Sequence, residues 1–504
     1  MSLMQNINPL KSRGTLRADF TASLVVFLVA VPLCVGVAVA SGVPAELGLI
    51  TGIVGGLVTG FLPGSSLQVS GPAAGLTVLV YEAVQTYGLA GLGVLVLVSG
   101  LLQLAMGLLK VGRWFRAISV AVVQGMLAGI GLVIMAGQVY ALADAKQPSS
   151  GLDKVFGLGK LITSTLGDGK AMIALALGVG TILILAFWPK WKAAQKIIPA
   201  PLAAVLLATA VTVALNLPVA RVEVSGLLES IQPPPLSEFA GLASAGMLGT
   251  VLAFTLIASA ESLFSAAAVD RLHDGPRTHY DKELIAQGAG NTLCGVLGAL
   301  PMTAVIVRSS ANVHAGAKTK LSRILHGVWI LVFAAAFPSV LGLVPLASLA
   351  GVLVHAGWKL LPVKDFMPLW RSHRSEAVVL ATTAIAIVAT DMFEGVLIGL
   401  LLSVVKTAWE TSHVHVETED PGPDRPLRVM VLGNATFLRL PKLQDQLEAL
   451  PSDRTVELNL SGLRHVDHAC GLALSTWEEE HNKAARAVGA EAGVPVAERE
   501  HSAV

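Results

Sequence analysis

Long apolar segments follow one another along most of this chain, and they constrain its fold more than any other feature. Crossing the hydrocarbon core of a bilayer takes roughly 20 apolar residues. Full-length spans are predicted near 20–40, 44–62, 88–108, 117–137, 171–188, 200–217, 246–268, 283–299, 323–342, 344–360, 375–391 and 393–410. Two further stretches, 72–86 and 303–313, are too short or too polar to cross alone and count as half-helices. The pattern predicts an α-helical polytopic membrane protein with fourteen transmembrane elements.

The charge content of the chain agrees with this prediction. Charged residues make up only 14% of it, whereas a soluble domain carries about 25%. The net charge of +1 and the lack of a basic run give no indication of a nucleic-acid partner. Cys34, Cys294 and Cys470 are scattered, so neither a disulfide framework nor a metal site is predicted. No nucleophile–base constellation is apparent either, so the sequence does not predict an enzyme.

The distribution of Lys and Arg predicts the orientation, because these residues accumulate in cytoplasmic loops. An even number of spans, with both termini in the cytoplasm, fits their alternation. The apolar run after Lys11, Arg13 and Arg17 is expected to be an uncleaved first helix. The loops expected in the cytoplasm carry Lys110, Arg113 and Arg116; Lys190, Lys192 and Lys196; Arg271, Arg277 and Lys282; Lys318, Lys320 and Arg323; and Lys359, Lys364, Arg371 and Arg374.

The apolar pattern stops near Trp409, and a different organisation follows. Residues 413–427 are polar and Pro-rich, which is typical of a linker. Beyond them, 428–432 and 455–460 alternate like strands, whereas 440–450 and 472–486 have a helical pattern. We therefore predict a transmembrane domain over 1–412, a small cytoplasmic α/β domain over 413–490 and a disordered polar tail over 491–504.

Two interrupted segments occupy matching positions in the two halves of the membrane region. One contains Ser70-Gly71-Pro72, and the other runs from Leu300-Pro301 to Ser310. Non-helical backbone at membrane depth is tolerated only where it is buried in protein or lines a cavity. The matched positions predict an inverted repeat whose two half-helix N-termini offer free N–H groups and positive dipole ends to an anion. The alternative is that Gly and Pro are simply frequent in transmembrane helices.

Glu261 lies in the middle of an apolar predicted helix, and Ser265 follows one turn later on the same face. An ionisable side chain inside the membrane is costly and is a functional candidate by default. The pair is therefore a candidate site for a coupling ion, either a proton or Na⁺; the metal assignment of Glu261 and Ser265 applies only to sodium. The alternative is that Arg308 neutralises Glu261 structurally.

From about residue 15 to residue 485 the chain resembles the sulfate permease, or solute carrier 26, family of anion transporters. Four motifs carry the resemblance, which is nearest to the bacterial bicarbonate-transporting branch: the Pro32-containing first helix that ends Ala40-Ser41-Gly42-Val43-Pro44, the Ser70-Gly71-Pro72 break, the Glu261 helix, and Asn312-Val313-His314-Ala315-Gly316. The C-terminal region resembles the family's STAS domain, with 431–437 as its entry strand and turn, and it is short enough to be truncated. Because His468 follows Asp467, the family's phosphorylatable Ser is missing there.

The resemblance implies a seven-plus-seven inverted repeat, divided into a core and a gate domain and assembled as a homodimer. It also implies that the anion lies between the third and tenth elements. In the bicarbonate branch, a stretch equivalent to 261–265 binds sodium. The implied substrate-binding residues are Ser70, Gly71, Pro72, Ala73, Val305, Ile306, Val307 and Arg308.

These observations predict a secondary active transporter of a small inorganic anion in the bacterial inner (cytoplasmic) membrane. Bicarbonate is the first expected substrate, and coupling to Na⁺ or H⁺ by alternating access is expected, with no other cofactor. Sulfate or a dicarboxylate is the alternative substrate. An uncoupled anion channel, or a membrane scaffold that works through its STAS domain, is the alternative from another class. The sequence leaves the anion, the coupling ion and the stoichiometry open.

Overall fold

The computed structural model describes residues 13–491 except 118, 149, 192, 193, 195–197, 224, 225, 391, 423 and 424. Almost all of the predicted tail, 491–504, therefore lies outside the described residues, as do Lys11, Lys192 and Lys196 of the orientation prediction. The chain divides into two compact units, one ending at Leu400 and the other beginning at Leu401. The boundary falls inside a single helix, α18 (Met392–Thr411).

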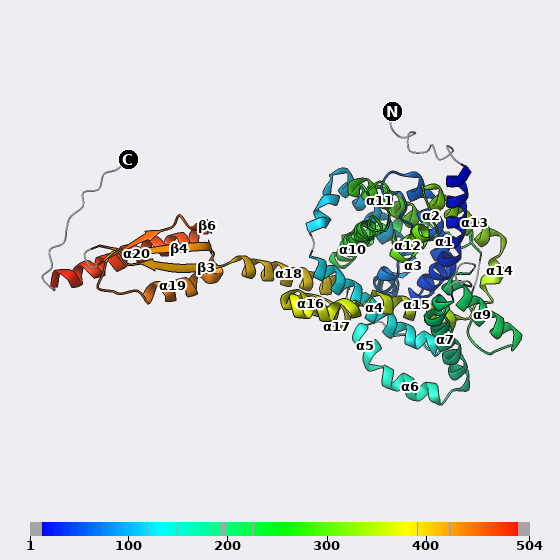
Figure 1. Ribbon diagram of the computed structural model, residues 1–504. Coiled ribbons are helices and arrows are strands. Elements are labelled where there is room, and N and C mark those ends of the chain that lie inside the picture. Colours follow the sequence, from blue (N-terminus) through cyan, green and yellow to red (C-terminus); the bar gives the residue numbers. More distant parts are fainter. Residues whose placement is uncertain are drawn as a thin grey trace. The chain divides into compact units, whose positions relative to one another are not determined.

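The first unit is mostly helical (Figure 1). Every predicted transmembrane segment overlaps a described helix or part of one. Among the described residues, seven helices are long and apolar enough to cross a membrane, and α2, α9 and α13 are shorter apolar helices. The helices are α1 (Arg13–Ala40), α2 (Ala45–Phe61), α3 (Thr77–Leu108), α4 (Val120–Leu142), α5 (Gly151–Phe156), α6 (Leu158–Leu166), α7 (Gly169–Phe187), α9 (Ala200–Ala214), α10 (Ala245–Val269), α11 (Tyr280–Val296), α12 (Ile306–His314), α13 (Leu321–Ala336), α14 (Pro338–Leu341), α15 (Leu346–Leu360), α16 (Val363–Ser372), α17 (Arg374–Ala389) and α18.

The α3 helix joins two of the predicted elements, the half-helix 72–86 and the span 88–108. Gly88 lies at the junction with φ 71°, a left-handed conformation that only glycine adopts at low cost. The helical assignment therefore runs through a sharp change of direction rather than through one straight rod. The sequence prediction of two elements describes this arrangement better than a single helix does.

The helices of this unit form two bundles. In one bundle α1, α2, α3, α10, α11, α12 and α13 pack against one another, and in the other α4, α7, α9, α15 and α17 do so. Close approach in the first bundle depends on small residues, as is common between membrane helices. At Gly100 of α3, a Cβ atom would lie only 2.7 Å from the Thr292 hydroxyl of α11. The two bundles correspond to the predicted core and gate.

Two three-residue strands lie inside the first bundle, at the predicted breaks. The β1 strand (Ser70–Pro72) pairs antiparallel with β2 (Met302–Ala304), with Gly71 opposite Thr303. The short 3₁₀ helix η2 (Ala74–Leu76) leads from β1 into α3, and β2 leads into α12. This antiparallel crossing of two strand–helix units is the local two-fold relation that an inverted repeat predicts.

The second unit contains a four-stranded sheet with two helices. The β4 strand (Leu427–Ala435) lies between β3 (Val414–Glu419), which is antiparallel to it, and the parallel strands β5 (Val456–Asn459) and β6 (Leu463–Val466). The helices are α19 (Leu440–Glu448) and α20 (His468–Glu491). Both predicted strands and both predicted helices are present, and the unit is consistent with a STAS-like domain.

The prediction of a linker over 413–427 was wrong for its first half. Val414 and Val416 point into the core of the unit while His415 and Glu417 point out, so the segment forms β3 along the edge of the sheet. Alternation over only six residues next to Pro421 gave too weak a pattern to predict a strand. The β6 strand was also missed; its side chains are largely exposed, so it lacks the buried alternation that marks a strand.

Candidate functional site

The candidate site is built around the β1–β2 pair. The N–H group of Val305 donates to the Val69 carbonyl at 2.9 Å, which extends the pairing by one residue up to the start of α12. Ile306, Val307 and Arg308 are the first residues of α12, and the first N–H groups of a helix have no acceptor within it. The positive end of the α12 dipole therefore lies at the strand crossing, which favours an anion there.

The structure brings the eight predicted substrate-binding residues together at this crossing. Ser70, Gly71, Pro72, Ala73 and Arg308 are buried, and Val305 is half-buried. Ile306 and Val307 are exposed on the first turn of α12. The Ser70 hydroxyl is engaged with α11, where it accepts a hydrogen bond from Gln287 at 2.8 Å. Their roles in binding stay predictions.

Arg308 is fully buried, and none of its three side-chain nitrogens has a hydrogen-bond partner among the described residues. The guanidinium lies directly against Gly71, where a Cβ atom would collide with Nη1. Cys34 of α1 and His326 of α13 are its other polar neighbours. Both ring nitrogens of the buried His326 also lack partners. A buried cation in this condition needs a partner from outside the described residues.

Glu261 of α10 lies against η2, the short helix that follows β1. A Cβ atom on Gly75 of η2 would stand 2.8 and 2.9 Å from the two carboxylate oxygens, so any larger residue there would force the carboxylate to move. Thr303 of β2 is also adjacent, and Oε2 of Glu261 is buried with no hydrogen-bond partner in the described chain. Ser265 is buried one turn along α10. The carboxylate therefore touches both broken segments.

The alternative role of Glu261, a structural ion pair with Arg308, is not supported. Among the ion pairs of the described residues, none joins these two side chains. Within the same residues, no group of three His, Cys, Asp or Glu side chains could hold a metal ion. A sodium site at Glu261 and Ser265 would need backbone oxygens as further ligands, which hard cations accept. That site stays a prediction.

Sequence reasoning missed a row of polar side chains on α11. Glu283, Gln287 and Asn291 are spaced four residues apart, and all three are buried. Asn291 accepts a hydrogen bond from the Met302 N–H at 2.7 Å and donates to the Met302 carbonyl at 3.0 Å, which fixes β2. Glu283 accepts a hydrogen bond from the Ser65 N–H in the loop before β1, and Gln287 donates one to Ser70, the first residue of β1. Their spacing on one face of a predicted span was the signal that could have revealed them.

Arg323, counted with the cytoplasmic charges, is instead buried inside α13. Its Nη1 donates to the carbonyls of Ser65 and Gln68 at 2.8 and 3.0 Å, and Nη2 donates to the Thr59 carbonyl. The guanidinium thus organises the loop that leads into β1. Arg323 belongs to the scaffold of the site rather than to the charges that set the orientation, because backbone carbonyls take the place of water around it.

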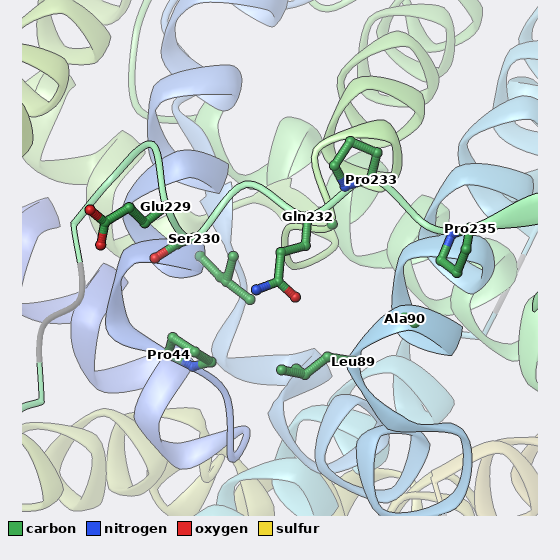
Figure 2. Close-up of a pocket in the computed structure, with 10 residues that line it drawn as sticks. Pro44, Leu89, Ala90, Glu229, Ser230, Gln232, Pro233 and Pro235 are labelled. Carbon is green, nitrogen blue, oxygen red and sulfur yellow. The ribbon is translucent and has the colours of Figure 1, made fainter.

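A pocket of about 230 Å³ lies apart from this site (Figure 2). Pro44 of the α1–α2 turn and Leu89, next to the Gly88 bend, form one side of it, and Gln232 projects into it from the segment before α10. None of the predicted site residues lines it. The pocket is therefore a separate feature of the first bundle.

Comparison with known proteins agrees with this arrangement. Residues 16–383 match the model of the sulfate permease family. The chain is 28% identical over 416 residues to a putative sulfate transporter of Bacillus subtilis, covering 80% of this chain and 76% of that protein. It is 25% identical over 441 residues to the bicarbonate transporter BicA of Picosynechococcus sp., covering 82% and 74%.

Solved structures show the same fold. The transmembrane domain of a cyanobacterial bicarbonate transporter BicA superposes with a TM-score of 0.67 at 22% identity, covering 78% of this chain and 98% of that one. Murine solute carrier 26 family member A9, in its inward-facing state, gives a TM-score of 0.78 at 17% identity and covers 94% and 85%. The chain is a multi-pass membrane protein that belongs to the sulfate permease family of anion transporters.

Proposed function

We propose that this chain is a secondary active transporter that binds a small inorganic anion, with bicarbonate as its first substrate, between the β1–η2 break and the start of α12. The observation that carries the proposal is Arg308, a fully buried cation with no partner in the described chain. Together with the free N–H groups of α12, it offers a monoanion one full charge and directed donors.

Glu261 couples this binding to a cation. Its carboxylate contacts η2 through Gly75 and lies beside Thr303 of β2, so H⁺ or Na⁺ at Glu261 changes the charge next to both segments that hold the anion. A channel that only conducts anions has no need of a carboxylate at this position. Coupling by alternating access follows, with Ser265 as a second oxygen ligand when the ion is Na⁺.

Sulfate or a dicarboxylate is the second candidate substrate. It is favoured by the relative named as a putative sulfate transporter, which is 28% identical to this chain. Bicarbonate is favoured by the match to BicA and by the charge of the site. A dianion ordinarily attracts more than one fixed cation, and Arg308 is the single Arg or Lys of the two broken segments.

The protein acts as a homodimer in the bacterial inner membrane, with both termini and the STAS domain in the cytoplasm. The proposed test is uptake of labelled bicarbonate, sulfate and fumarate into proteoliposomes, with sodium and proton gradients imposed separately. Accumulation of bicarbonate driven by one of the two gradients is expected. Gradient-independent equilibration of all three anions would instead indicate a channel.

A further inference from the structure

A polar contact joins the core to the gate on one side of the first unit. Lys154 of α5 lies over the ring of Tyr81 on α3, with its Nζ 5.5 Å from the ring centre. Lys154 is only 1% exposed, and Tyr81 is also buried. Tyr81 belongs to the core bundle, whereas α5 packs on α4 and α17 of the gate. A cation over an aromatic face is attracted to it, and more strongly when water is excluded.

Gln147, in the connection between α4 and α5, makes a second link between the two bundles. Its side-chain nitrogen donates to the Ala40 carbonyl, at the end of α1, at 3.1 Å. Its backbone carbonyl accepts from the Tyr81 hydroxyl at 3.3 Å. The side chain also packs closely on α4, because a Cβ atom on Gly137 would collide with its Oε1. Gln147 is therefore held by the gate and bonds to two helices of the core.

Each side of this contact is fixed within its own bundle. In the gate, the Tyr140 hydroxyl of α4 donates to the Lys154 carbonyl at 2.9 Å. In the core, the Tyr81 ring packs on Gly42, which has φ 72° and whose Cβ atom would lie 3.2 Å from the ring. Glu82, next to Tyr81 on α3, is a charged neighbour of Lys154. Movement of one bundle past the other would therefore break the contact, because neither partner is free to follow.

Tyr81 is also close in the chain to the candidate anion site. The half-helix that carries Tyr81 begins at Thr77, directly after η2, and Gly75 of η2 contacts Glu261. About one helical turn separates Thr77 from Tyr81. The contact lies on the side of the unit where α1 and α4 end, which faces away from the cytoplasm in the predicted orientation. In alternating access, bonds between core and gate on one side must break before the site opens to that side.

We propose that Lys154, Tyr81 and Gln147 form a latch that holds the core against the gate on the side of the membrane where α1 ends. This inference rests on the alternating access of the proposed function and adds the contact that controls one of its two openings. Because Tyr81 and the anion site share one half-helix, movement of this half-helix with the bound anion breaks the latch. Weakening the latch favours the arrangement that is open to this side.

A cavity next to the latch provides a reporter for its test. It has a volume of about 230 Å³ and lies between α1 of the core and α4 and α15 of the gate, with Lys146 among its lining residues. Ala350 of α15 also lines it and is 1% exposed. Ala350→Cys is introduced into the full-length chain after its three native cysteines are replaced by alanine. Its rate of reaction with a membrane-impermeant methanethiosulfonate reagent should be slow and should increase when the core moves off the gate.

Lys154→Met is expected to raise the reaction rate of the Ala350→Cys reporter about tenfold, because loss of a buried cation–ring attraction shifts the population toward the open arrangement. Gln147→Met should raise it about fivefold, since one hydrogen bond between the bundles is lost. Lys160→Met on α6 is the matched control, because Lys160 is exposed. It should leave the rate unchanged.

A second reporter separates opening of the latch from loosening of the fold. With Cys294 of α11 as the single cysteine, the reaction should stay slow in all variants, since this side chain is buried inside the core bundle. An unchanged rate at position 350 in both latch variants, or an equal rise at Cys294, would overturn the latch. Uptake in proteoliposomes tests the proposed function separately. If the reporter responded as expected in a protein that accumulates no anion, the latch would stand and the proposed function would fall.

Discussion

Two places in the first unit, the loop before β1 and the β1–β2 crossing, each contain a buried arginine and an acidic residue. The surroundings of these charged side chains differ between the two places. At the loop before β1, Arg323 donates to three carbonyls and Glu283 accepts from Ser65 and Gln287. At the strand crossing, Arg308 has no hydrogen-bond partner and one oxygen of Glu261 has none, within the described residues. Arg323 thus makes three hydrogen bonds and leaves only its Nε without a partner, whereas all three side-chain nitrogens of Arg308 lack one among the described residues.

The difference distinguishes scaffold from site. A buried charge without a partner costs several kcal/mol, so a fold keeps one only where something compensates it. In the loop before β1 the polypeptide itself supplies the compensation. At the β1–β2 crossing the polypeptide does not supply it. The two side chains there, Arg308 and Glu261, have opposite charges, as binding of an anion and of a coupling cation would need. Substitutions at the two places should therefore fail in different ways.

The largest effect is expected in the loop before β1. Arg323→Ala would leave the carbonyls of Thr59, Ser65 and Gln68 without this donor, and each buried carbonyl left unsatisfied costs about 1–3 kcal/mol. The yield of monodisperse protein and its unfolding temperature without substrate should both fall sharply. Size-exclusion chromatography and thermal unfolding in detergent measure this. Normal folding of Arg323→Ala would remove the distinction between the two places.

Glu261→Gln should leave the protein folded and abolish ion-coupled uptake. The substitution keeps the shape of the side chain next to Gly75 but removes the charge that a proton or Na⁺ neutralises. Accumulation of labelled anion against its gradient is the measurement, and the control is Glu46→Gln, a buried acidic residue in the first turn of α2. Wild-type accumulation in Glu261→Gln would exclude a coupling role.

Deletion of residues 413–504 should have a smaller effect. All residues of the proposed site precede residue 413, so the truncated protein should still bind its anion. Assembly or turnover should decrease, because the C-terminal domain is expected to serve dimer contact or trafficking. The anion-dependent rise in unfolding temperature tests this. A folded truncation without that rise, beside a full-length protein that shows it, would assign part of the site to the C-terminal domain.

The smallest expected effect concerns Asp467, which lies in the second unit. Like Glu283, its carboxylate accepts hydrogen bonds from backbone N–H groups. The N–H groups of Cys470 and Phe437 hold the pKa of Asp467 below its ordinary value of 3.8. Because the folded pKa is the lower one, the stabilisation is complete above the ordinary pKa and is lost as pH falls through the folded pKa. As pH falls through the folded pKa of Asp467, the protection of the amides at the start of α20 against hydrogen exchange should decrease. Asp467→Asn should remove this pH dependence.

Much of this molecule could be predicted from its sequence. Length and apolarity identified the membrane elements, since a bilayer imposes a fixed span. The Gly and Pro residues at 71, 72 and 301 marked the breaks that became β1 and β2, and the crossing contains the predicted residues. Glu261 was selected as a candidate because a carboxylate in an apolar helix is unusual, and its role stays a prediction.

What could not be predicted depends on contacts between distant residues. Gln287 and Ser70 are 217 positions apart, so the α11 row shows its polar face in the sequence but not its partners. Arg323 follows Lys318 and Lys320 and was grouped with them, although one helical turn takes it from the boundary into the protein. Whether a buried charged side chain has hydrogen-bond partners likewise depends on the fold. The different environments of Arg308 and Arg323 depend on residues that are distant in the sequence, so they could not be predicted from the segments around the two arginines.

The measurement that tests this account most directly is the bicarbonate-dependent rise in unfolding temperature of Arg308→Ala beside that of the wild-type protein. The account predicts that Arg308→Ala folds, with an unfolding temperature without bicarbonate no lower than that of the wild type, because an uncompensated buried charge has been removed. It also predicts an apparent affinity about tenfold to a hundredfold weaker, since a hydrogen bond to a charged group contributes about 1.5–3 kcal/mol. An unchanged affinity, or loss of folding, would show that Arg308 belongs to the scaffold and would contradict the account.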